Sequence, residues 1–279
     1  MAIPTRTLGS TEIPVTALGL GGEGVLRTHG RDREAHELIR RAVDLGITYF
    51  ESARAYAGSE QYLGRGLGGD RQRVFLATKT HHRTARGARA HLDESLALLQ
   101  TTWLDLWYLH DLRSQRDLDQ ITGPGGALET VEAARRAGQV RLVGISGHES
   151  PQILGKALEL YPFQVILLPV NPAEACADSF AAGVLPEAAR RGLGVVAMKT
   201  LCRGLVTRLP GFAGPGPFLH YALSTPGVST LSVGCDSSAQ LEQNVAAVEA
   251  FAPLPAGPRE ALEQLTYPAA GELLYYRPR

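Results

Sequence analysis

The chain has 279 residues, 44% of them hydrophobic, and its 28 basic and 28 acidic residues leave a formal net charge of zero. A chain without a basic block lacks the electrostatic footprint of a nucleic-acid-binding protein, and no apolar run is long enough to predict a membrane span or a signal peptide. The three cysteines are far apart and form no Cys-x-x-Cys pair, which argues against a zinc ribbon or an iron–sulfur cluster. We therefore expect a cytoplasmic protein that binds neither nucleic acid nor membranes; its oligomeric state is left open.

Short apolar runs alternate with helical patterns along most of the chain. A hairpin at residues 5–8 and 13–17 comes first, and residues 253–279 form a Pro-rich extension with a helix at 259–267. The expected strands span residues 18–21, 47–51, 73–78, 104–109, 140–145, 164–168, 194–198 and 228–233. The helices expected after them span residues 32–45, 58–67, 84–101, 125–137, 151–160, 179–191, 216–224 and 237–251. Eight such units predict a (β/α)₈ TIM barrel with an N-terminal β-hairpin and a C-terminal extension, with residues 1–279 as one domain.

Four polar residues lie at or just beyond the ends of three consecutive predicted strands. Glu51 ends the second strand, and Tyr56 follows it five residues later. Lys79 and His110 come directly after the third and fourth strands. Because all strands of such a barrel end on the face that carries the chemistry, we expect these four side chains to meet there.

Together these four groups form a proton-donating set. A free tyrosine has a pKa of about 10, and a neighbouring ammonium stabilises the phenolate and lowers that pKa. A carboxylate can hold the ammonium in place, and an imidazole can orient a carbonyl oxygen by hydrogen bonding. Such a set would protonate an oxygen while a hydride reaches the attached carbon.

The motifs around these residues resemble those of the aldo-keto reductase superfamily over nearly the whole chain. Residues 50–56, Phe-Glu-Ser-Ala-Arg-Ala-Tyr, are similar to the family's Phe-Asp-Thr-Ala-x-x-Tyr signature, and residues 77–79 and 105–110 resemble its strands that end in a lysine and a histidine. The resemblance implies an enzyme that uses NADP(H) or NAD(H) to interconvert a carbonyl compound and an alcohol. It makes Tyr56 the general acid/base, Lys79 its pKa-lowering partner and His110 the group that orients the carbonyl. Glu51 stands where the family has Asp.

The same resemblance extends to a cofactor site along later strand ends. Residues 144–148 resemble the family's Gly-x-Ser-Asn-Phe element in its Gly-x-Ser-Gly-His variant, which implies that Ser146 and His148 hold the nicotinamide carboxamide. Residues 234–244 resemble the stretch that binds the adenosine end. Met198 would contact the nicotinamide ring or pack in the core, and these two interpretations are left open. The cofactor-binding residues implied are Ser146, His148, Asn171, Met198, Lys199, Leu201, Gly234, Asp236, Ser237, Gln240, Gln243 and Asn244.

The adenosine end departs from many relatives, which place Arg or Lys there to pair with the 2′-phosphate of NADP. Here Gly234, Asp236 and Gln240 occupy those places. A carboxylate repels a phosphate but can accept a hydrogen bond from a ribose hydroxyl, which favours NAD(H). The family as a whole favours NADP(H), and Lys199 or Arg203 could supply the missing charge, so both cofactors stay open.

Two further patterns predict no site of their own. Residues 19–24, Gly-Leu-Gly-Gly-Glu-Gly, match a dinucleotide fingerprint superficially, but no helix follows at the required distance, and we expect a strand-end turn. His81 and His82 are adjacent, and neighbours on an extended segment point to opposite sides. We therefore expect a solvated loop there and no metal site.

Glu51 keeps two alternative functions open. A Glu reaches about 1.5 Å farther than an Asp, and a misplacement of that size can cost about 10²-fold in rate. The alternatives are a cofactor-binding sensor or partner subunit with little turnover, and a redox-neutral epimerase or dehydratase. Turnover of NADH or NADPH with a panel of aldehydes, ketones and keto sugars distinguishes them.

The first prediction concerns Glu51→Asp. If the site is an ordinary reductase, this change restores the family's carboxylate, so steady-state carbonyl reduction stays equal to the wild type or rises. A loss of about 10²-fold would show that the longer side chain serves a different geometry or reaction.

Overall fold

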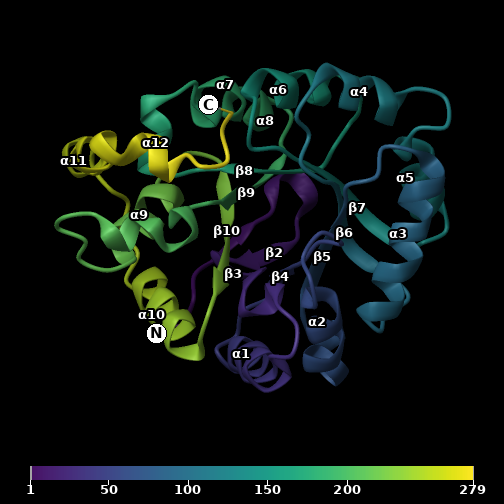
Figure 1. Ribbon diagram of the computed structural model, residues 1–279, viewed down its shortest axis with the longest axis horizontal. Helices are drawn as coiled ribbons and strands as arrows, with labels where there is room; N and C mark the ends of the chain where they lie inside the picture. Colours follow the sequence, from purple (N-terminus) through teal and green to yellow (C-terminus); the bar gives the residue numbers. More distant parts are fainter. Residues whose placement is uncertain (1, 279) are drawn as a thin grey trace.

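Eight parallel strands close into a barrel that helices surround (Figure 1). The structure, a computed structural model, describes residues 2–278. The barrel strands are β3 Leu18–Gly24, β4 Tyr49–Glu51, β5 Phe75–Thr80, β6 Leu104–Leu109, β7 Val140–Ser146, β8 Val165–Pro169, β9 Gly194–Met198 and β10 Val228–Cys235. They are hydrogen-bonded in chain order, and β10 pairs with β3 to close the ring. The predicted (β/α)₈ fold is confirmed.

The helices follow the strands around the ring. They are α1 Asp32–Asp44, α2 Ser59–Leu67, α3 Ala85–Leu98, α4 Gln115–Thr122, α5 Ala127–Arg136, α6 Pro151–Leu160, α7 Phe180–Gly183, α8 Leu185–Arg190, α9 Gly216–Leu223, α10 Ser238–Glu249, α11 Ala256–Thr266 and α12 Ala270–Leu273. The apolar faces of α1 to α10 pack on the outside of the strands in one large buried cluster. A second cluster fills the barrel interior, so the barrel is a packed core and its chemistry must lie at an end.

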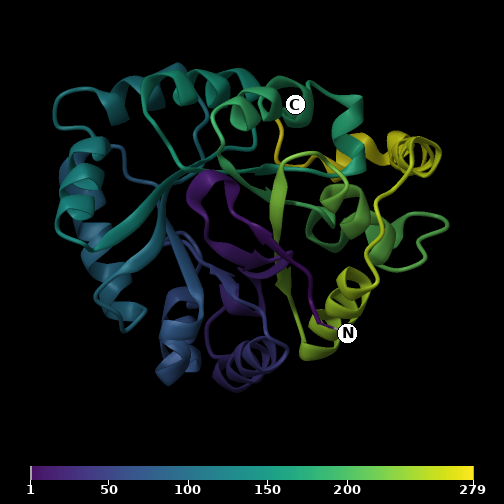
Figure 2. The same cartoon turned by 180° about the vertical axis from the view of Figure 1, so that it is seen from behind.

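The N-terminal hairpin lies across one end of the barrel (Figure 2). Its strands β1 Thr5–Thr7 and β2 Pro14–Thr16 pair antiparallel, and Leu8 at its turn packs with the interior cluster. Ser10 donates a backbone hydrogen bond of 2.8 Å to the carbonyl of Gly192, two residues before β9. The hairpin therefore closes the N-terminal end of the strands and leaves the C-terminal end for function.

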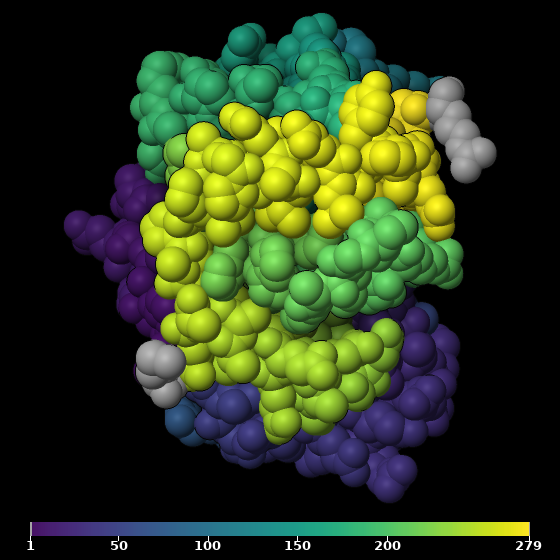
Figure 3. Space-filling model, turned by 90° about the vertical axis from the view of Figure 1, so that its left-hand side faces the viewer, coloured from purple at the N-terminus to yellow at the C-terminus, as the bar shows by residue number. Residues whose placement is uncertain are grey.

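The C-terminal segment covers another part of the molecule. Figure 3 shows it (yellow) beside the loop after β9 (green). Phe218 of α9, Leu273 of α12 and Cys202 and Val206 of that loop belong to one buried cluster. The extension thus packs against a loop that follows a strand end, on the functional side of the barrel.

Three of the differences between the structure and the predicted elements have clear local causes. The expected helix 179–191 is two short helices, because Val184 leaves the helical conformation and Pro186 lacks an N–H in the first turn of α8. Residues 111–124, where no helix or strand was expected, contain α4, which begins with a capping box between Ser114 and Asp117. Helix α3 ends at Leu98, before Gln100 adopts a positive φ of 52°.

None of the helices within residues 2–278 combines the length and the apolar character needed to cross a membrane.

Candidate active site

A buried ion pair joins two neighbouring strand ends. Lys79 Nζ on β5 donates hydrogen bonds to Glu51 Oε1 on β4 and, at 2.8 Å, to the carbonyl of Ser52. Both side chains are almost fully buried. Burial lowers the pKa of Lys79, and the charge of Glu51 opposes that effect. The longer carboxylate therefore does reach the lysine in this fold.

Tyr56 lies over this pair, between two cations. Lys79 Nζ is 4.6 Å from the centre of its ring and the Arg27 guanidinium carbon is 4.9 Å from it. The side chain is partly exposed and lines the cleft described below. Burial raises the pKa of Tyr56 well above its usual value, and the carboxylates of Glu51 and Glu23 raise it further. The direction of this pKa change is opposite to that expected from the sequence, because burial and the two carboxylates outweigh the nearby cations.

His110 completes the group at the end of β6. Its ring meets Tyr56 edge to face, with 5.9 Å between centroids. Burial, and then the charge of Lys79, lower the pKa of His110 well below its usual value, so the imidazole is neutral near pH 7. Its buried Nδ1 has no hydrogen-bond partner among residues 2–278. The four residues expected to meet at the strand ends are thus brought together.

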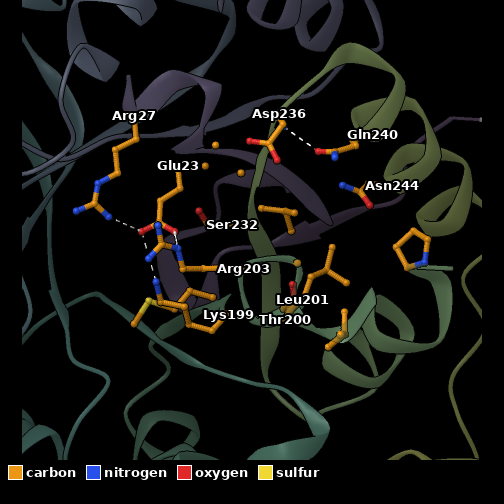
Figure 4. A pocket seen from close by; sticks show the side chains of 18 of the residues that line it. Glu23, Arg27, Lys199, Thr200, Leu201, Arg203, Ser232, Asp236, Gln240 and Asn244 are labelled. Atoms are coloured by element: carbon orange, nitrogen blue, oxygen red, sulfur yellow. Dashed lines mark hydrogen bonds and ion pairs between the residues drawn. The ribbon is translucent and has the colours of Figure 1, made fainter. Parts of the chain in front are cut away.

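A cleft of about 560 Å³ opens beside Tyr56. Figure 4 shows Glu23 on one side of it, facing Arg27, Lys199 and Arg203. Glu23 lies 3.0 Å from Arg27, 3.5 Å from Lys199 and 3.8 Å from Arg203. Burial acts to raise the pKa of Glu23, but these cations outweigh it and the pKa is lowered. This part of the cleft wall carries an excess of positive charge.

The loop after β9 forms part of this wall in an uncommon conformation. Lys199, Cys202 and Arg203 have positive φ angles of 57°, 46° and 53°. Non-glycine residues rarely adopt this conformation, and where they do it is often at ligand-binding sites. The backbone here turns Lys199 and Arg203 toward Glu23.

The opposite wall is built by β10 and the N-terminus of α10. Ser237 caps the helix by accepting a 3.3 Å hydrogen bond from the Gln240 amide, and Gln240 Oε1 accepts one of 2.8 Å from the Asp236 amide. Gly234, Gln243 and Asn244 line the cleft beside them. Within the described residues, β10 and α10 contribute no Arg or Lys to the cleft wall.

Ser146, His148 and Asn171 lie outside the wall of this cleft, and the last two contact Tyr276 of the C-terminal segment. Ser146 Oγ accepts a 2.9 Å hydrogen bond from the Asp111 amide, and His148 Nε2 is 3.0 Å from Asp111 Oδ1. Asn171 donates hydrogen bonds to the Lys199 carbonyl at 3.2 Å and to the Tyr276 hydroxyl at 2.9 Å. Its buried Oδ1 has no partner within the described chain.

The predicted residues thus divide into groups. Those on the cleft wall are Glu51, Tyr56, Met198, Lys199, Leu201, Gly234, Asp236, Gln240, Gln243 and Asn244. Lys79, His110, Ser146, His148, Asn171 and Ser237 are not part of that wall. Met198 both lines the cleft and packs against the interior cluster, so its two interpretations are compatible.

Sequence reasoning missed Glu23, Arg27 and Tyr276. Glu23 lies near the end of β3, which extends to Gly24 and not only to residue 21 as expected. The strand-end position that singled out Lys79 would also have found Glu23. Tyr276 carried no such signal, because a distant packing contact places it against Asn171.

The expectation that His81 and His82 point to opposite sides is wrong. Their rings stack, with 5.4 Å between centroids and 24° between planes, because the chain leaves β5 before them. Both also contact the ring of His91 on α3. Burial lowers the pKa of His91 to about 4, so its ring is neutral near pH 7.

Comparison with known proteins gives a consistent result. The sequence model of the family described as "Aldo/keto reductase family" matches residues 17–211. The chain is 27% identical to L-galactose dehydrogenase of Arabidopsis thaliana, over 88% of both chains. It is 30% identical to the aldo-keto reductase YhdN of Bacillus subtilis, over 72% of this chain and 63% of that protein.

Two further relatives extend this comparison. A 6-dehydroglucose reductase of Novosphingobium aromaticivorans is 27% identical over 71% of this chain and 69% of its own. Among solved structures, the holo form of an aldo-keto reductase from Bacillus halodurans superposes with a TM-score of 0.79. It is 25% identical, and the match covers 94% of this chain and 96% of that one.

The second prediction tests the buried pair. Lys79→Met leaves the Glu51 carboxylate without its counterion and should lower the free energy of unfolding by about 3–5 kcal/mol, and Glu51→Gln should act similarly. The double variant Glu51→Gln/Lys79→Met should recover much of this loss in urea unfolding. Arg65→Met is the control, because Arg65 and its partner Asp32 are exposed and such pairs contribute about 1 kcal/mol or less. Additive effects of the two single changes would contradict a formed pair.

Proposed function

Because the chain belongs to the aldo-keto reductase family and is an oxidoreductase of that class, we propose that it reduces a carbonyl with Tyr56 as the general acid and a nicotinamide cofactor in the cleft. The observation that carries the proposal is the meeting of Tyr56, Lys79, Glu51 and His110 at adjacent strand ends. The alternatives of low turnover or a redox-neutral reaction depended on a displaced carboxylate at position 51. Since Glu51 reaches Lys79, the argument for these alternatives is weaker and reduction is favoured.

The cleft has features suited to such a cofactor. Gly24 has a φ of 69°, and a Cβ there would lie 2.3 Å from the Cys235 carbonyl oxygen, so the glycine lets two strand ends approach each other at the cleft wall. Lys199 and Arg203 suit the pyrophosphate. Asn171 lies behind the cleft wall, and its buried Oδ1, which has no partner in the described chain, would suit an amide donor such as the carboxamide. When bound, the cofactor supplies the hydride.

The residues of the chain would supply the proton and the orientation. The raised pKa keeps the Tyr56 phenol protonated at neutral pH, as a general acid in the direction of reduction requires. Neutral His110 can donate a hydrogen bond to the same carbonyl oxygen without competing as an acid. Lys79 beside the ring stabilises the phenolate that forms once the proton has left.

We favour a sugar or another polyhydroxylated carbonyl compound as the substrate. The cleft beside Tyr56 carries the carboxylate of Glu23, the guanidinium of Arg27 and the hydroxyl of Thr28. These groups suit the hydroxyls of a sugar better than an apolar ketone. L-galactose dehydrogenase and 6-dehydroglucose reductase, two relatives with sugar substrates in their names, support the same class.

We further propose that the cofactor is NAD(H). Lys199 and Arg203 are the two cations that could bind a 2′-phosphate, and both face Glu23. They lie on the other side of the cleft from Asp236 (Figure 4). Asp236 is exposed at the opposite wall, where a phosphate would meet its negative charge. A carboxylate there suits a free ribose hydroxyl.

The third prediction tests the general acid. Tyr56→Phe removes the proton donor and keeps the ring, so kcat for reduction of keto sugars should fall by about 10²–10⁴-fold, while cofactor affinity measured by fluorescence quenching changes little. Tyr267→Phe is the control, because it removes a hydroxyl from an exposed tyrosine that is not on the cleft wall. Equal rates for Tyr56→Phe and wild type would exclude Tyr56 as the acid.

The fourth prediction concerns cofactor choice. Wild-type protein should have the higher kcat/KM with NADH, and Asp236→Ser should raise kcat/KM for NADPH about tenfold, the effect of about 1.4 kcal/mol of relieved repulsion. Asp44→Ser, an exposed carboxylate on α1, should change neither value. A wild-type preference for NADPH would overturn the assignment and leave the reductase proposal intact.

A further inference from the structure

Three histidine rings gather beside the active site on elements that the proposed reaction does not use. His81 and His82 follow directly after β5, and His91 lies on α3. Ring centroids are 4.6 Å apart for His81 and His91 and 4.2 Å apart for His82 and His91. One ring nitrogen from each residue lies within 4.8 Å of the other two.

We propose that His81, His82 and His91 form a binding site for a divalent transition-metal ion, with Zn²⁺ as the physiological candidate. Zinc binds imidazole nitrogen at about 2.0–2.1 Å, which places two nitrogens of a tetrahedral site about 3.3 Å apart. The ring nitrogens reach that separation if each pair moves closer together by about 1.5 Å or less. His81 and His82 are exposed and can rotate to provide it.

Neighbouring groups hold two of the ligands in place. The Thr80 hydroxyl is 3.0 Å from His91 Nδ1 and accepts a 3.2 Å hydrogen bond from the His82 amide. With Nδ1 engaged, His91 presents Nε2, and such partners commonly orient metal-binding histidines. Gly87 leaves room for the His82 ring, since a Cβ at position 87 would lie 2.6 Å from that ring.

The charges around the cluster permit a cation. Arg54 and Arg83 both act electrostatically on His81. Arg54 is paired with Glu60 at 2.6 Å and Glu94 at 2.7 Å. Arg83 is paired with Asp117 at 3.0 Å. Both positive charges near the rings therefore have counterions.

The ligand type selects the metal. Three imidazoles suit Zn²⁺, Cu²⁺ or Ni²⁺, whereas Mg²⁺ and Ca²⁺ require oxygen ligands. Asp111, His148 and Glu149 form the other close group of potential ligands among the described residues. There Arg113 already pairs with both carboxylates, which makes the group a poorer cation site.

Because His81 lies two residues beyond Lys79, a bound ion would fasten the start of the β5–α3 loop to α3 beside the catalytic strand end. The proposal does not depend on turnover. It concerns metal binding and the stability of that loop, and its test is independent of the test of the proposed reductase activity.

The test is zinc binding by the full-length, metal-free protein. Isothermal titration with ZnSO₄ should show one ion per chain, and His91→Ala should weaken the affinity by about 10²-fold or more. His36→Ala removes an exposed histidine from α1 and should bind as the wild type does. Circular dichroism shows whether His91→Ala remains folded, and Gly87→Ala, which displaces the His82 ring and keeps all three ligands, should also weaken binding.

Two further results decide the assignment. Co²⁺ in place of zinc should give the visible absorption of a low-symmetry site with nitrogen ligands, and His81→Ala should abolish it. Absence of stoichiometric zinc binding would overturn the proposal. Binding that survives His91→Ala would also overturn it and would place the ion elsewhere, with Asp111, His148 and Glu149 as the next group to test.

Discussion

Barrel closure is the constraint on which the rest of this structure depends. Eight parallel strands can close only if each ends on the same face, and neighbours in the ring then bring their last residues together. Glu51 and Lys79 are 28 residues apart in the chain but lie on adjacent strands, β4 and β5. The hairpin fills the opposite end with Leu8. Chemistry is thereby confined to one face.

On that face the main electrostatic problem is a buried ammonium. An isolated Lys79 in this position would lose its proton, and Glu51 with the Ser52 carbonyl keeps the charged form in place. The resulting pair leaves Tyr56 close to charges of both signs. Burial and the carboxylates outweigh the nearby cations at the phenol, which makes a proton donor the resting form.

The two walls of the cleft carry different charges. Glu23 holds Lys199 and Arg203 on one wall, and Asp236 projects from the other (Figure 4). The C-terminal segment organises the region behind the cleft wall, because Tyr276 joins Asn171 to the buried carboxylate of Glu174 by hydrogen bonds of 2.9 and 2.7 Å. A segment near the end of the chain therefore sets the surroundings of a residue at the end of β8.

The sequence by itself determined the order of strands and helices, the barrel, and the group of Glu51, Tyr56, Lys79 and His110. These depend on local periodicity and on strand-end positions that a closed parallel sheet makes adjacent. The capping box that begins α4 is also encoded in neighbouring residues, although the helix was not predicted.

Only the tertiary structure decided the direction of the pKa of Tyr56, the charge pairs of Glu23, the contact of Tyr276 with Asn171 and the gathering of His81, His82 and His91. Burial and side-chain direction come from packing between elements far apart in the chain. No spacing along the sequence encodes that packing.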